Sequence, residues 1–318
     1  MSDEQSAPVC YRHRNRETYL RCVRCDKPIC ADCRIDAPVG FQCPGCVAEG
    51  RKSMRKTRSA FGGRASTAFG GSSAGAAGTV TKVLIGLNVA MFILTLAVGG
   101  TAAITSSTQL HYALAEASVF QYGQGVFHTF ANVELFGTMY SLPGVSTGGE
   151  YRMVTAMFLH FGAVHLLFNM VVLWILGRVL EKDLGSLRFL AVYLVSGLVG
   201  SVAVYVFTNP ITLTAGASGA VYGLFGVLIL VNRRLGRESS GIYVLLGINL
   251  VLTVVMGFSL AGHVGGLVGG LLCGAVLAFT PASQRKVLHW VGFAVILAMM
   301  VVLTMWRTDT LLTQFGVA

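Results

Sequence analysis

Charged side chains are scarce in this chain of 318 residues: they make up 12% of the sequence, whereas 54% of the residues are hydrophobic. Soluble globular domains carry about 25% charged residues. The composition therefore excludes an ordinary soluble protein and indicates a membrane protein. The first residues also lack the basic stretch, apolar core and cleavage site of a signal peptide, so we expect an N-terminus that is not exported.

Cysteine is almost absent after residue 46, because seven of the eight cysteines lie between Cys10 and Cys46 and Cys273 stands alone in an apolar run. Together with one histidine, the seven form four pairs, each with a two-residue gap. The paired residues are Cys10 and His13, Cys22 and Cys25, Cys30 and Cys33, and Cys43 and Cys46. This is an awkward set for disulfides, but it matches the ligands of two tetrahedral zinc ions.

Residues 1–50 therefore predict a small head that folds around two structural zinc ions, because so short a segment has little apolar core. Zinc thiolates also favour a reducing compartment. The spacing resembles B-box or cross-brace zinc modules, which implies that the first and third pairs share one ion and the second and fourth pairs the other. Sequential pairing is the alternative. No recognition helix is apparent, so we expect a protein partner for this head and no nucleic acid.

Residues 51–81 predict a linker. It begins with five Lys and Arg residues between Arg51 and Arg58. Gly, Ala and Ser dominate from Phe61 to Gly78, which predicts a flexible tether. A basic cluster before a membrane span is typical of a topology signal and of contact with anionic lipid.

Long apolar runs organise residues 82–318. They cover residues 83–99, 164–180, 189–207, 216–232, 242–258, 260–279 and 288–306. A membrane-spanning helix needs about 20 such residues, and fewer where its ends are buried in protein. We therefore predict an all-α polytopic membrane protein with seven spans. Residues 100–163 have no Lys or Arg before Arg152 and predict an external loop that lies partly in the membrane interface.

Positive charge predicts the orientation of these spans. Lys and Arg residues follow the second, fourth and sixth spans at Arg178, Lys182, Arg188, Arg233, Arg234, Arg237, Arg285 and Lys286. The opposite side has only Arg152 and Arg307. Because basic loops stay in the cytosol, we expect a multi-pass plasma-membrane protein with a cytosolic N-terminus.

Two candidate catalytic residues lie near the starts of two spans. Ser218 stands in the sequence Gly216-Ala-Ser-Gly219, and His263 follows Ala261-Gly262. Both spans run inwards from the external side, so both side chains are expected at a similar depth just below that surface. A histidine that touches a serine can activate it as a nucleophile, and Tyr222 is placed to pack under the imidazole. Close approach of the two spans is favoured by small-residue spacing at Gly262, Gly266 and Gly270 and at Gly265 and Gly269.

The second span adds polar groups at the same level. His165 and Asn169 are four residues apart and share one helix face. Their side chains are donors of the kind that stabilise an oxyanion, as are the free backbone N–H groups at the helix start that carries Ser218. His160 does not lie on that face, which argues against a helix-borne metal pair with His165, although a site formed by three histidines is an alternative.

Carboxylates are missing from this constellation. Glu181, Asp183 and Glu238 are expected at the cytosolic end, and Glu134 and Glu150 in the loop. A third triad member is therefore absent, and the sequence supports a Ser–His dyad at most.

The membrane domain resembles the rhomboid intramembrane serine proteases. The motifs that carry the resemblance are Glu150-Tyr-Arg152-Met-Val-Thr155, His160-x4-His165-x3-Asn169, Gly216-x-Ser218-Gly219 with Tyr222, and Ala261-Gly-His263-Val-Gly-Gly. The resemblance implies a six-helix catalytic core at residues 82–280, to which residues 281–318 add one C-terminal helix. It also implies that Ser218 is the nucleophile, that His263 is the base, and that Asn169, His165 and the Ser218 amide form the oxyanion site. His160 is implied to be structural, and Arg152 to belong to a structured external loop. Tyr151 departs from the pattern, since many members carry Trp there.

We therefore predict a serine endopeptidase that needs no cofactor for catalysis, opens to the external side, and cleaves transmembrane segments of other membrane proteins in the lipid bilayer. One alternative is a non-catalytic rhomboid-like protein that binds membrane-protein clients. A transporter is the other alternative, but the polar cluster lies near one face and the spans show no obvious inverted repeat.

Overall fold

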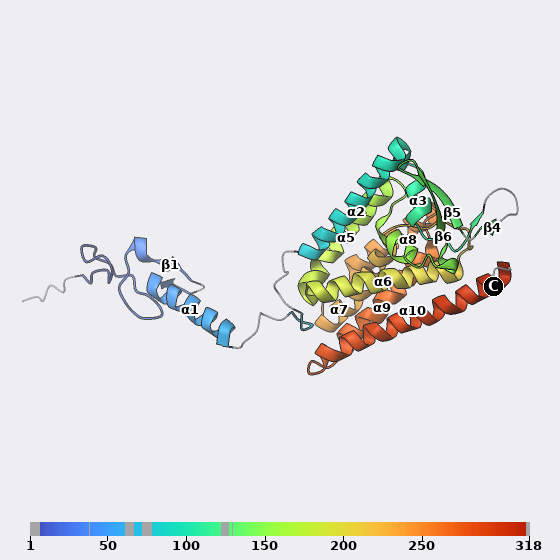
Figure 1. Cartoon of the computed structure of the whole chain (residues 1–318). Coiled ribbons are helices and arrows are strands. Elements are labelled where there is room, and N and C mark those ends of the chain that lie inside the picture. Colours follow the sequence, from blue (N-terminus) through green and yellow to red (C-terminus); the bar gives the residue numbers. More distant parts are fainter. Residues whose placement is uncertain are drawn as a thin grey trace, which may run out of the picture. The chain divides into compact units, whose positions relative to one another are not determined.

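A computed structural model describes residues 7–37, 39–60, 67–71, 78–121, 127–128 and 130–315. The chain divides into two compact units, Met1–Ala65 and Ser66–Ala318 (Figure 1). Most of the predicted tether between Phe61 and Gly78 lies outside the described residues.

The first unit contains short elements and one long helix. The 3-10 helix η1 spans Ala31–Cys33, the antiparallel strands β1 and β2 span Ile35–Asp36 and Phe41–Gln42, and α1 spans Pro44–Ala60. Its buried cluster consists of Ile29 and six of its seven cysteines, so apolar burial alone stabilises this unit little. Proline is favourable in the first turn of a helix. Since α1 continues to Ala60, the basic cluster assigned to the linker is helical.

In the described part of the second unit, seven long helices lie at the positions that the apolar runs predict. They are α2 (Thr79–Gly99), α5 (Ala163–Leu184), α6 (Ser186–Phe207), α7 (Ser218–Leu235), α8 (Ser240–Val255), α9 (Leu260–Phe279) and α10 (Arg285–Phe315). Among the described residues, five helices are long and apolar enough to cross a membrane: α2 with η3 (Gly100–Ile104), α5, α6, α9 and α10. The other two, α7 and α8, have 18 and 16 residues. A helix enclosed by protein can be shorter and less apolar, and α7 is largely buried. The predicted all-α polytopic membrane fold is confirmed.

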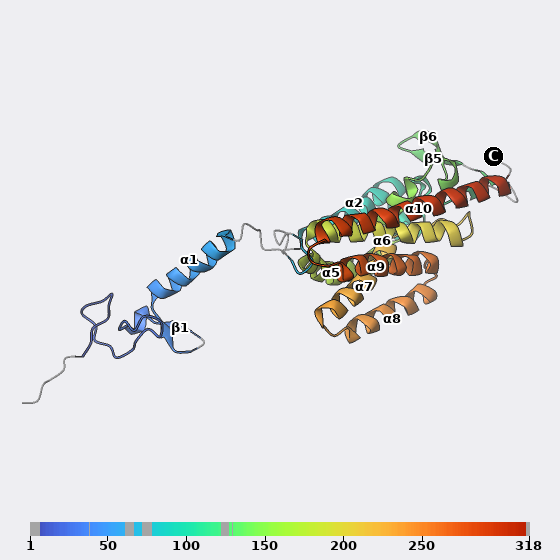
Figure 2. The ribbon, with the colours of Figure 1, turned by 90° about the horizontal axis from the view of Figure 1, so that it is seen from below.

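The glycine ladder sets the distance between α7 and α9, which pack side by side with α6 against both (Figure 2). A Cβ atom added at Gly266 would overlap the carbonyl oxygen of Gly219, and one added at Gly270 would overlap that of Gly223. Small residues allow this backbone-to-backbone approach between membrane helices. Because both helices begin at the same end of the bundle, their first residues are brought together.

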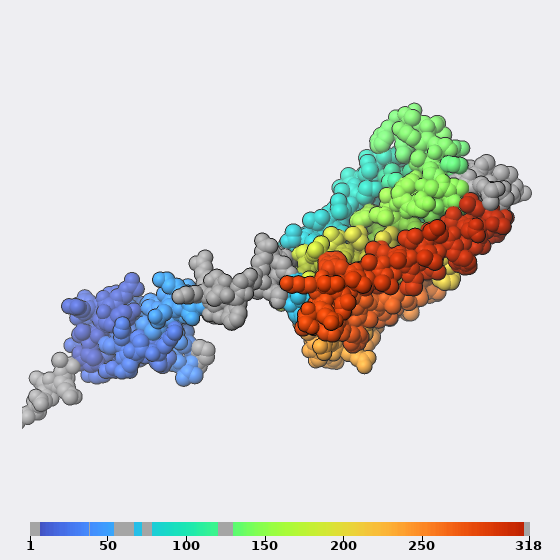
Figure 3. Space-filling view, turned by 60° about the horizontal axis from the view of Figure 1, so that its bottom comes forward, coloured from blue at the N-terminus to red at the C-terminus, as the bar shows by residue number. Residues whose placement is uncertain are grey.

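The two remaining helices of interest lie at the margins of the bundle. Figure 2 shows α8 at one edge, beyond α7 and α9. The C-terminal helix α10 runs along another face, beside α6 (Figure 3). Its Phe293, Ile296 and Met300 side chains are buried in the main apolar cluster, so the added helix packs on the bundle as an integral part of this unit.

The long connection between α2 and α5 is folded. It contains α3 (Gln109–Leu114), β3 (Phe120–Gln121), β4 (Phe127–His128), β5 (Phe130–Leu135), β6 (Thr138–Pro143), η4 (Val145–Thr147), α4 (Arg152–Thr155) and η5 (Ala156–Phe158). Antiparallel pairing joins β3 to β4 and β5 to β6. Phe136 and Gly137 connect β5 to β6 with φ values of +53° and +77°, as a tight two-residue hairpin turn requires. Residues 130–143 of the predicted external loop therefore form a hairpin, which the sequence did not predict.

The buried side chain of Arg152 holds the connection between α2 and α5 together. It donates hydrogen bonds to the carbonyl oxygens of Pro143 (2.6 Å), Tyr112 (2.8 Å) and Ala115 (3.0 Å). These acceptors belong to the end of β6, to α3 and to the residue that follows α3. One guanidinium thus holds the hairpin and α3 against α4, consistent with the structured loop that the rhomboid resemblance implies.

A short turn closes the opposite end of the second unit, where the basic residues gather. Residues Thr67–Gly71, here called the anchor turn, close through hydrogen bonds from the Thr67 N–H to the Gly71 carbonyl (2.8 Å) and back to the Thr67 hydroxyl (2.9 Å). Phe69 at its tip is 1% exposed and joins the main apolar cluster. Arg188 on α6 and Arg285 on α10 donate to carbonyl oxygens of this turn at 3.0 and 2.7 Å. This part of the predicted tether is docked on the bundle.

The acidic side chains of the same end stabilise the helix termini there. The Glu181 carboxylate accepts from the backbone N–H groups of Val80 and Thr81, each at 3.0 Å, at the start of α2. A carboxylate is favourable at a helix N-terminus. Asp183 forms an ion pair with Arg237 at 2.5 Å. Both carboxylates lie far from the start of α7, as the predicted topology requires.

Candidate active site

Ser218 and His263 meet where α7 and α9 begin. Ser218 is the first residue of α7 and His263 is the fourth residue of α9. The Ser218 Oγ atom lies 2.7 Å from the His263 Nε2 atom, which is a short hydrogen bond of the kind that links a nucleophile to its base. His263 is 3% exposed, so bulk water scarcely reaches the imidazole.

Gly216 shapes the backbone that leads into Ser218. Its φ of +142° lies in a region that glycine adopts readily and residues with a Cβ atom do not. A Cβ atom there would lie 2.8 Å from His165 Cε1 and 3.3 Å from Ser218 Oγ. Glycine therefore lets the backbone pass between the serine and the imidazole of His165, which places that ring beside the nucleophile.

Tyr222 supports the His263 ring from below. It lies one turn after Ser218 on α7, and its ring stacks on the imidazole with centroids 4.2 Å apart and an interplanar angle of 13°. The Tyr222 hydroxyl is 2.8 Å from the hydroxyl of Thr253 on α8. Thr253 in turn lies 2.7 Å from His263 Nδ1. The sequence predicts that Tyr222 packs under the histidine, but it does not single out Thr253, because a lone threonine in an apolar run carries no distinguishing signal.

His165 and Asn169 lie on one face of α5, next to the nucleophile. The Asn169 side-chain amide donates to the carbonyl oxygen of His165 at 2.9 Å. The His165 ring stacks on Phe258 with centroids 4.6 Å apart. Among the residues that the structure describes, neither ring nitrogen of His165 has a hydrogen-bond partner, although the residue is 6% exposed. A buried imidazole with a free N–H beside Ser218 is available to a developing negative charge.

His160 occupies a different position, behind the backbone that carries the nucleophile. Its Nε2 atom accepts from the Ala217 N–H at 3.4 Å, and its carbonyl oxygen lies 3.1 Å from Nε2 of His111. Burial, and then the nearby His165, lower the pKa of His160 well below its ordinary value, so the ring is neutral and can accept. The ring of His160 is edge-on to that of His165.

Two cavities reach the serine–histidine pair. A small one, of about 40 Å³, is lined by residues of α5, α7 and α8, with His165, Asn169, Ser218 and His263 in its wall. A larger one, of about 930 Å³, extends from Ser218 and His263 between α6, α9 and α10. None of the described residues that line the small cavity is a carboxylate, so the arrangement there is a dyad with neutral polar neighbours.

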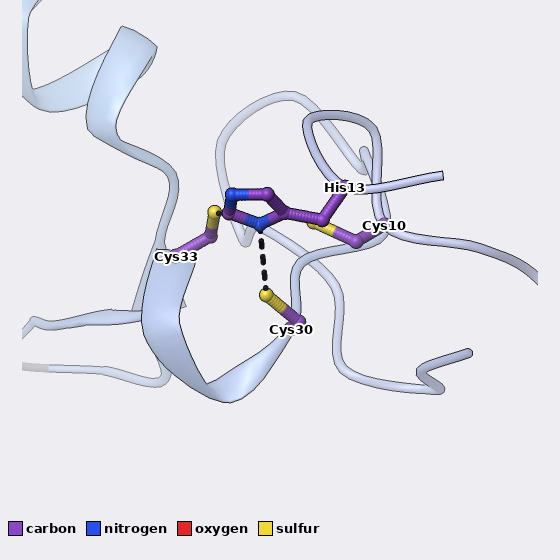
Figure 4. Close-up of side chains that lie close together, drawn as sticks. All are labelled: Cys10, His13, Cys30 and Cys33. Atoms are coloured by element: carbon purple, nitrogen blue, oxygen red, sulfur yellow. Dashed lines mark hydrogen bonds between the residues drawn. The ribbon is translucent and has the colours of Figure 1, made fainter. Parts of the chain in front are cut away.

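The first unit brings its eight soft ligands into two groups. One holds Cys10, His13, Cys30 and Cys33, and the other holds Cys22, Cys25, Cys43 and Cys46; in each group the ligand atoms all lie within 4.8 Å of one another. Figure 4 shows the first group, with His13 Nδ1 3.3 Å from Cys30 Sγ. The pairs alternate between the groups, as in the cross-brace arrangement, and sequential pairing is wrong. Four sulfur and nitrogen donors at this spacing fit a tetrahedral metal ion.

Backbone N–H groups lower the pKa of three of these thiols, Cys10, Cys22 and Cys43. Burial alone would raise the pKa of Cys10 and of Cys22, but nearby backbone N–H groups, including those of Arg12 and Arg24, more than offset this and lower the pKa of each to about 6. The thiolate is the form that binds metal.

The structure therefore defines a polytopic helical membrane protein in which a serine and a histidine meet at one end of the bundle. Comparison with known proteins agrees: the Rhomboid domain matches residues 147–280. The chain is 36% identical over 147 residues to the rhomboid protease GluP of Bacillus subtilis (strain 168), covering 44% of this chain and 28% of GluP. It is 39% identical over 145 residues to the rhomboid-family protein YdcA of the same organism, covering 42% of this chain and 70% of YdcA. It is 34% identical over 142 residues to the rhomboid protease GlpG of Salmonella choleraesuis (strain SC-B67), covering 43% of this chain and 50% of GlpG.

This chain belongs to the rhomboid family. The match spans less than two thirds of the length of GluP and of GlpG. The Rhomboid domain match at residues 147–280 lies within the second unit. The family relationship rests on the bundle that carries Ser218, His263, His165 and Asn169.

Proposed function

We propose that this protein is an intramembrane serine endopeptidase that cleaves transmembrane segments of other membrane proteins with Ser218 and His263. The observation that carries the proposal is the 2.7 Å contact between Ser218 Oγ and His263 Nε2 at the start of two adjacent helices. Membership of the rhomboid family and the names of its protease relatives support the same activity. Catalysis needs no cofactor in this scheme.

The reaction begins when Ser218 Oγ attacks the carbonyl carbon of the scissile peptide bond while His263 Nε2 takes the hydroxyl proton. The carbonyl oxygen becomes an oxyanion, and the Ser218 N–H at the free start of α7, the Asn169 amide and His165 are placed to donate to it. When the C–N bond breaks, His263 gives its proton to the leaving amine. An ester on Ser218 remains. Water then attacks that ester as His263 again takes a proton. The bond between Ser218 Oγ and the acyl carbon breaks, His263 returns the proton to Ser218 Oγ, and the acid product leaves.

The substrate has to unwind before it can react, because the carbonyl oxygens of an intact helix are hydrogen-bonded and shielded. The dyad lies in a wall shared by two cavities, one of which is large and mostly apolar. A mostly apolar cavity beside the dyad suits an extended apolar segment that enters it from the surrounding bilayer. Water reaches the ester through the polar lining near His165 and Asn169.

The distribution of charge supports a multi-pass plasma-membrane protein with its N-terminus in the cytosol and Ser218 towards the external side. The basic residues at the ends of α5 and α7 and at the starts of α6 and α10 lie at the end of the bundle opposite Ser218. Basic loops remain in the cytosol. The first unit would then be a cytosolic head in which two structural zinc ions hold the two ligand groups, and it would offer a surface for a protein partner.

The activity is tested with the purified full chain in liposomes. Ser218 is expected to react with a fluorophosphonate serine-hydrolase probe, and the same preparation is expected to cleave a fluorogenic transmembrane substrate. Ser218→Ala and His263→Ala should each abolish both signals while the thermal unfolding midpoint stays close to that of the parent protein. Cleavage that persists in Ser218→Ala would overturn the proposal. Binding of the substrate without cleavage by the parent protein would instead support a non-catalytic member of the family.

A further inference from the structure

Thr253 is the point at which α8 enters the core. It is 1% exposed, and it is the only buried residue of α8, all of whose residues the structure describes. The neighbouring Val254 and Val255 are 69% and 72% exposed. A helix that is almost entirely peripheral therefore inserts one hydroxyl group beside the imidazole of His263.

Three contacts converge on the Thr253 hydroxyl. Its Oγ1 atom lies 2.8 Å from the carbonyl oxygen of Asn249, 2.8 Å from the Tyr222 hydroxyl and 2.7 Å from His263 Nδ1. Each distance is that of a good hydrogen bond. One hydroxyl group thus joins the helix backbone of α8, the tyrosine under the base, and the base itself.

The number of donor protons and acceptor lone pairs determines the direction of all three hydrogen bonds of Thr253 Oγ1. A carbonyl oxygen accepts only, and threonine has one hydroxyl proton, so Thr253 donates that proton to Asn249. Its two lone pairs are then acceptors, and both Tyr222 and His263 must donate to them. His263 therefore carries its proton on Nδ1. The Nε2 atom is left with a lone pair, 2.7 Å from Ser218 Oγ, and that is the tautomer that can remove the serine proton.

We propose that Thr253 is a positioning residue that holds His263 in the base-competent tautomer, so that Ser218, His263 and Thr253 form one hydrogen-bonded chain. The proposal rests on the serine-protease function proposed above. A neutral hydroxyl anchored to a helix carbonyl takes the place that an acidic residue occupies in a Ser-His-Asp triad. With the opposite tautomer, Nε2 would donate to Ser218 and could not act as a base.

Thr253 also stabilises the positive charge that His263 acquires during the reaction. When His263 accepts the serine proton, its Nδ1–H becomes a stronger donor, so the threonine oxygen stabilises the imidazolium more than the neutral ring. The titratable groups that face His263 from adjacent elements are Tyr222 on α7, stacked on it, and His165 on α5, in the wall of the same small cavity. Neither supplies a negative charge at neutral pH. Among the described residues, the Thr253 hydroxyl is therefore the group that accepts a hydrogen bond from His263 Nδ1.

A consequence is that the base is oriented by the position of α8. Since Thr253 is the buried contact of this helix, a displacement of α8 away from α7 would remove the acceptor from Nδ1 and free the imidazole to change tautomer. The ability of His263 to act as a base thus depends on the packing of one peripheral helix, α8, against α7.

The test compares Thr253→Val, Thr253→Ser and Val254→Ala in the full chain. Valine keeps the shape of threonine but removes the hydroxyl, serine keeps the hydroxyl, and Val254→Ala is a control at the adjacent, exposed position of α8. We expect Thr253→Val to lower kcat by about 10- to 1000-fold with KM changed less than about threefold. Thr253→Ser should restore kcat to within about threefold of the parent enzyme, and Val254→Ala should match the parent.

The pH profile separates positioning from folding. Loss of the acceptor makes the imidazolium harder to form, so the acid limb of kcat against pH should move to lower pH in Thr253→Val and return in Thr253→Ser. An unchanged kcat in Thr253→Val would overturn the inference. A loss of kcat with an unmoved acid limb, or one that serine does not restore, would overturn it as well, since either points to packing alone. If Ser218→Ala retains cleavage in the same assay, the proposed function itself fails.

Discussion

Gly266 of α9 lies so close to Gly219 of α7 that a Cβ atom on Gly266 would overlap the Gly219 carbonyl oxygen. The obstacle is backbone, which cannot rotate away as a side chain can. Gly266→Ala should therefore push the two helices apart, cost about 1–3 kcal/mol of stability and lower cleavage by on the order of 100-fold, because Ser218 and His263 separate.

Gly86→Ala is the matched control for this substitution, since nothing lies within 4 Å of a Cβ atom at Gly86 on α2. It should leave cleavage unchanged and raise stability slightly, by about 0.4–1 kcal/mol, because alanine favours the helix. Thermal unfolding in detergent and probe labelling of Ser218 measure the two effects. Equal behaviour of Gly266→Ala and Gly86→Ala would mean that the helices can slide without loss.

The buried guanidinium of Arg152 gives a second prediction. Replacing Arg152 by Ala would leave the carbonyl oxygens of Pro143, Tyr112 and Ala115 without their donor. Unsatisfied buried acceptors cost about 1–3 kcal/mol each, so the loop should loosen and the unfolding midpoint should fall. Limited proteolysis at residues 109–147 measures the loosening. Tyr112→Ala, which keeps the backbone acceptor, is the control, and equal protection of Arg152→Ala and the parent would contradict the role given to the guanidinium.

Glu116 predicts a pH dependence of stability. The residue is 2% exposed, its backbone pairs with that of Thr214, and burial raises the pKa of its carboxyl group well above the ordinary value. The native protein therefore holds a proton that the unfolded chain releases near pH 4.5. The contribution of this protonated carboxyl group to the free energy of unfolding is fully present below that pH. It falls as the pH rises towards the folded-state pKa, by at most about 1.4 kcal/mol per pH unit.

Glu116→Gln should remove this slope, because glutamine stays neutral. Thermal unfolding midpoints measured between pH 5 and pH 9 would then converge with those of the parent at the acid end and exceed them at the alkaline end. Parallel curves for the two proteins would show that Glu116 ionises without cost.

The anchor turn gives a fourth prediction. Phe69 is buried in the main apolar cluster, and the carbonyl oxygens of its neighbours Gly70 and Ala68 accept hydrogen bonds from Arg188 and Arg285. Phe69→Ala should cost about 3–5 kcal/mol locally and release the turn, so that a protease cuts the chain near residue 69 more rapidly. Phe279→Ala is the control, since Phe279 is 64% exposed at the end of α9. Unaltered cleavage rates in Phe69→Ala would show that the backbone hydrogen bonds suffice.

Metal removal gives a fifth prediction. The full chain should contain two zinc ions, and Cys22→Ser should lower the content to one or fewer, because a serine hydroxyl is a poor replacement for a thiolate ligand. Cys273→Ser makes the same substitution at the isolated cysteine of α9 and should leave the zinc content at two. Elemental analysis of the purified proteins decides the matter. Two zinc ions in Cys22→Ser would exclude that residue as a ligand.

The sequence was sufficient to locate the seven helices because each coincides with a long apolar run, and long runs have few alternative structures in a membrane protein. The contact between Ser218 and His263 followed from topology, since both residues stand near the starts of helices that run in the same direction. Orientation and glycine spacing together place them at one level. The alternation of the cysteine pairs in the head agrees with what the resemblance to cross-brace zinc modules implied, whereas the spacing alone left sequential pairing open.

The remaining features depend on contacts that leave no mark in a single sequence. Thr253 stands in an apolar helix where a threonine is unremarkable, and only the fold brings its hydroxyl to His263. The anchor turn is hidden in a Gly-, Ala- and Ser-rich stretch whose composition indicates a free tether, yet Phe69 finds an apolar site between helices that lie far along the chain. The β5–β6 hairpin was missed because its turn is Phe136-Gly137, where phenylalanine takes an unusual left-handed conformation.

The alternating ligand pairs of the head have a consequence for how it assembles. An ion held by Cys10, His13, Cys30 and Cys33 encloses Cys22 and Cys25 in the loop between its own ligands. Closing that loop constrains Cys22 and Cys25, and it leaves Cys43 and Cys46 a short segment beyond Cys33. The first ion therefore removes part of the entropy that would otherwise oppose the second site. Assembly of the head should then respond to metal supply steeply, with few half-loaded molecules, as a threshold rather than a gradual titration.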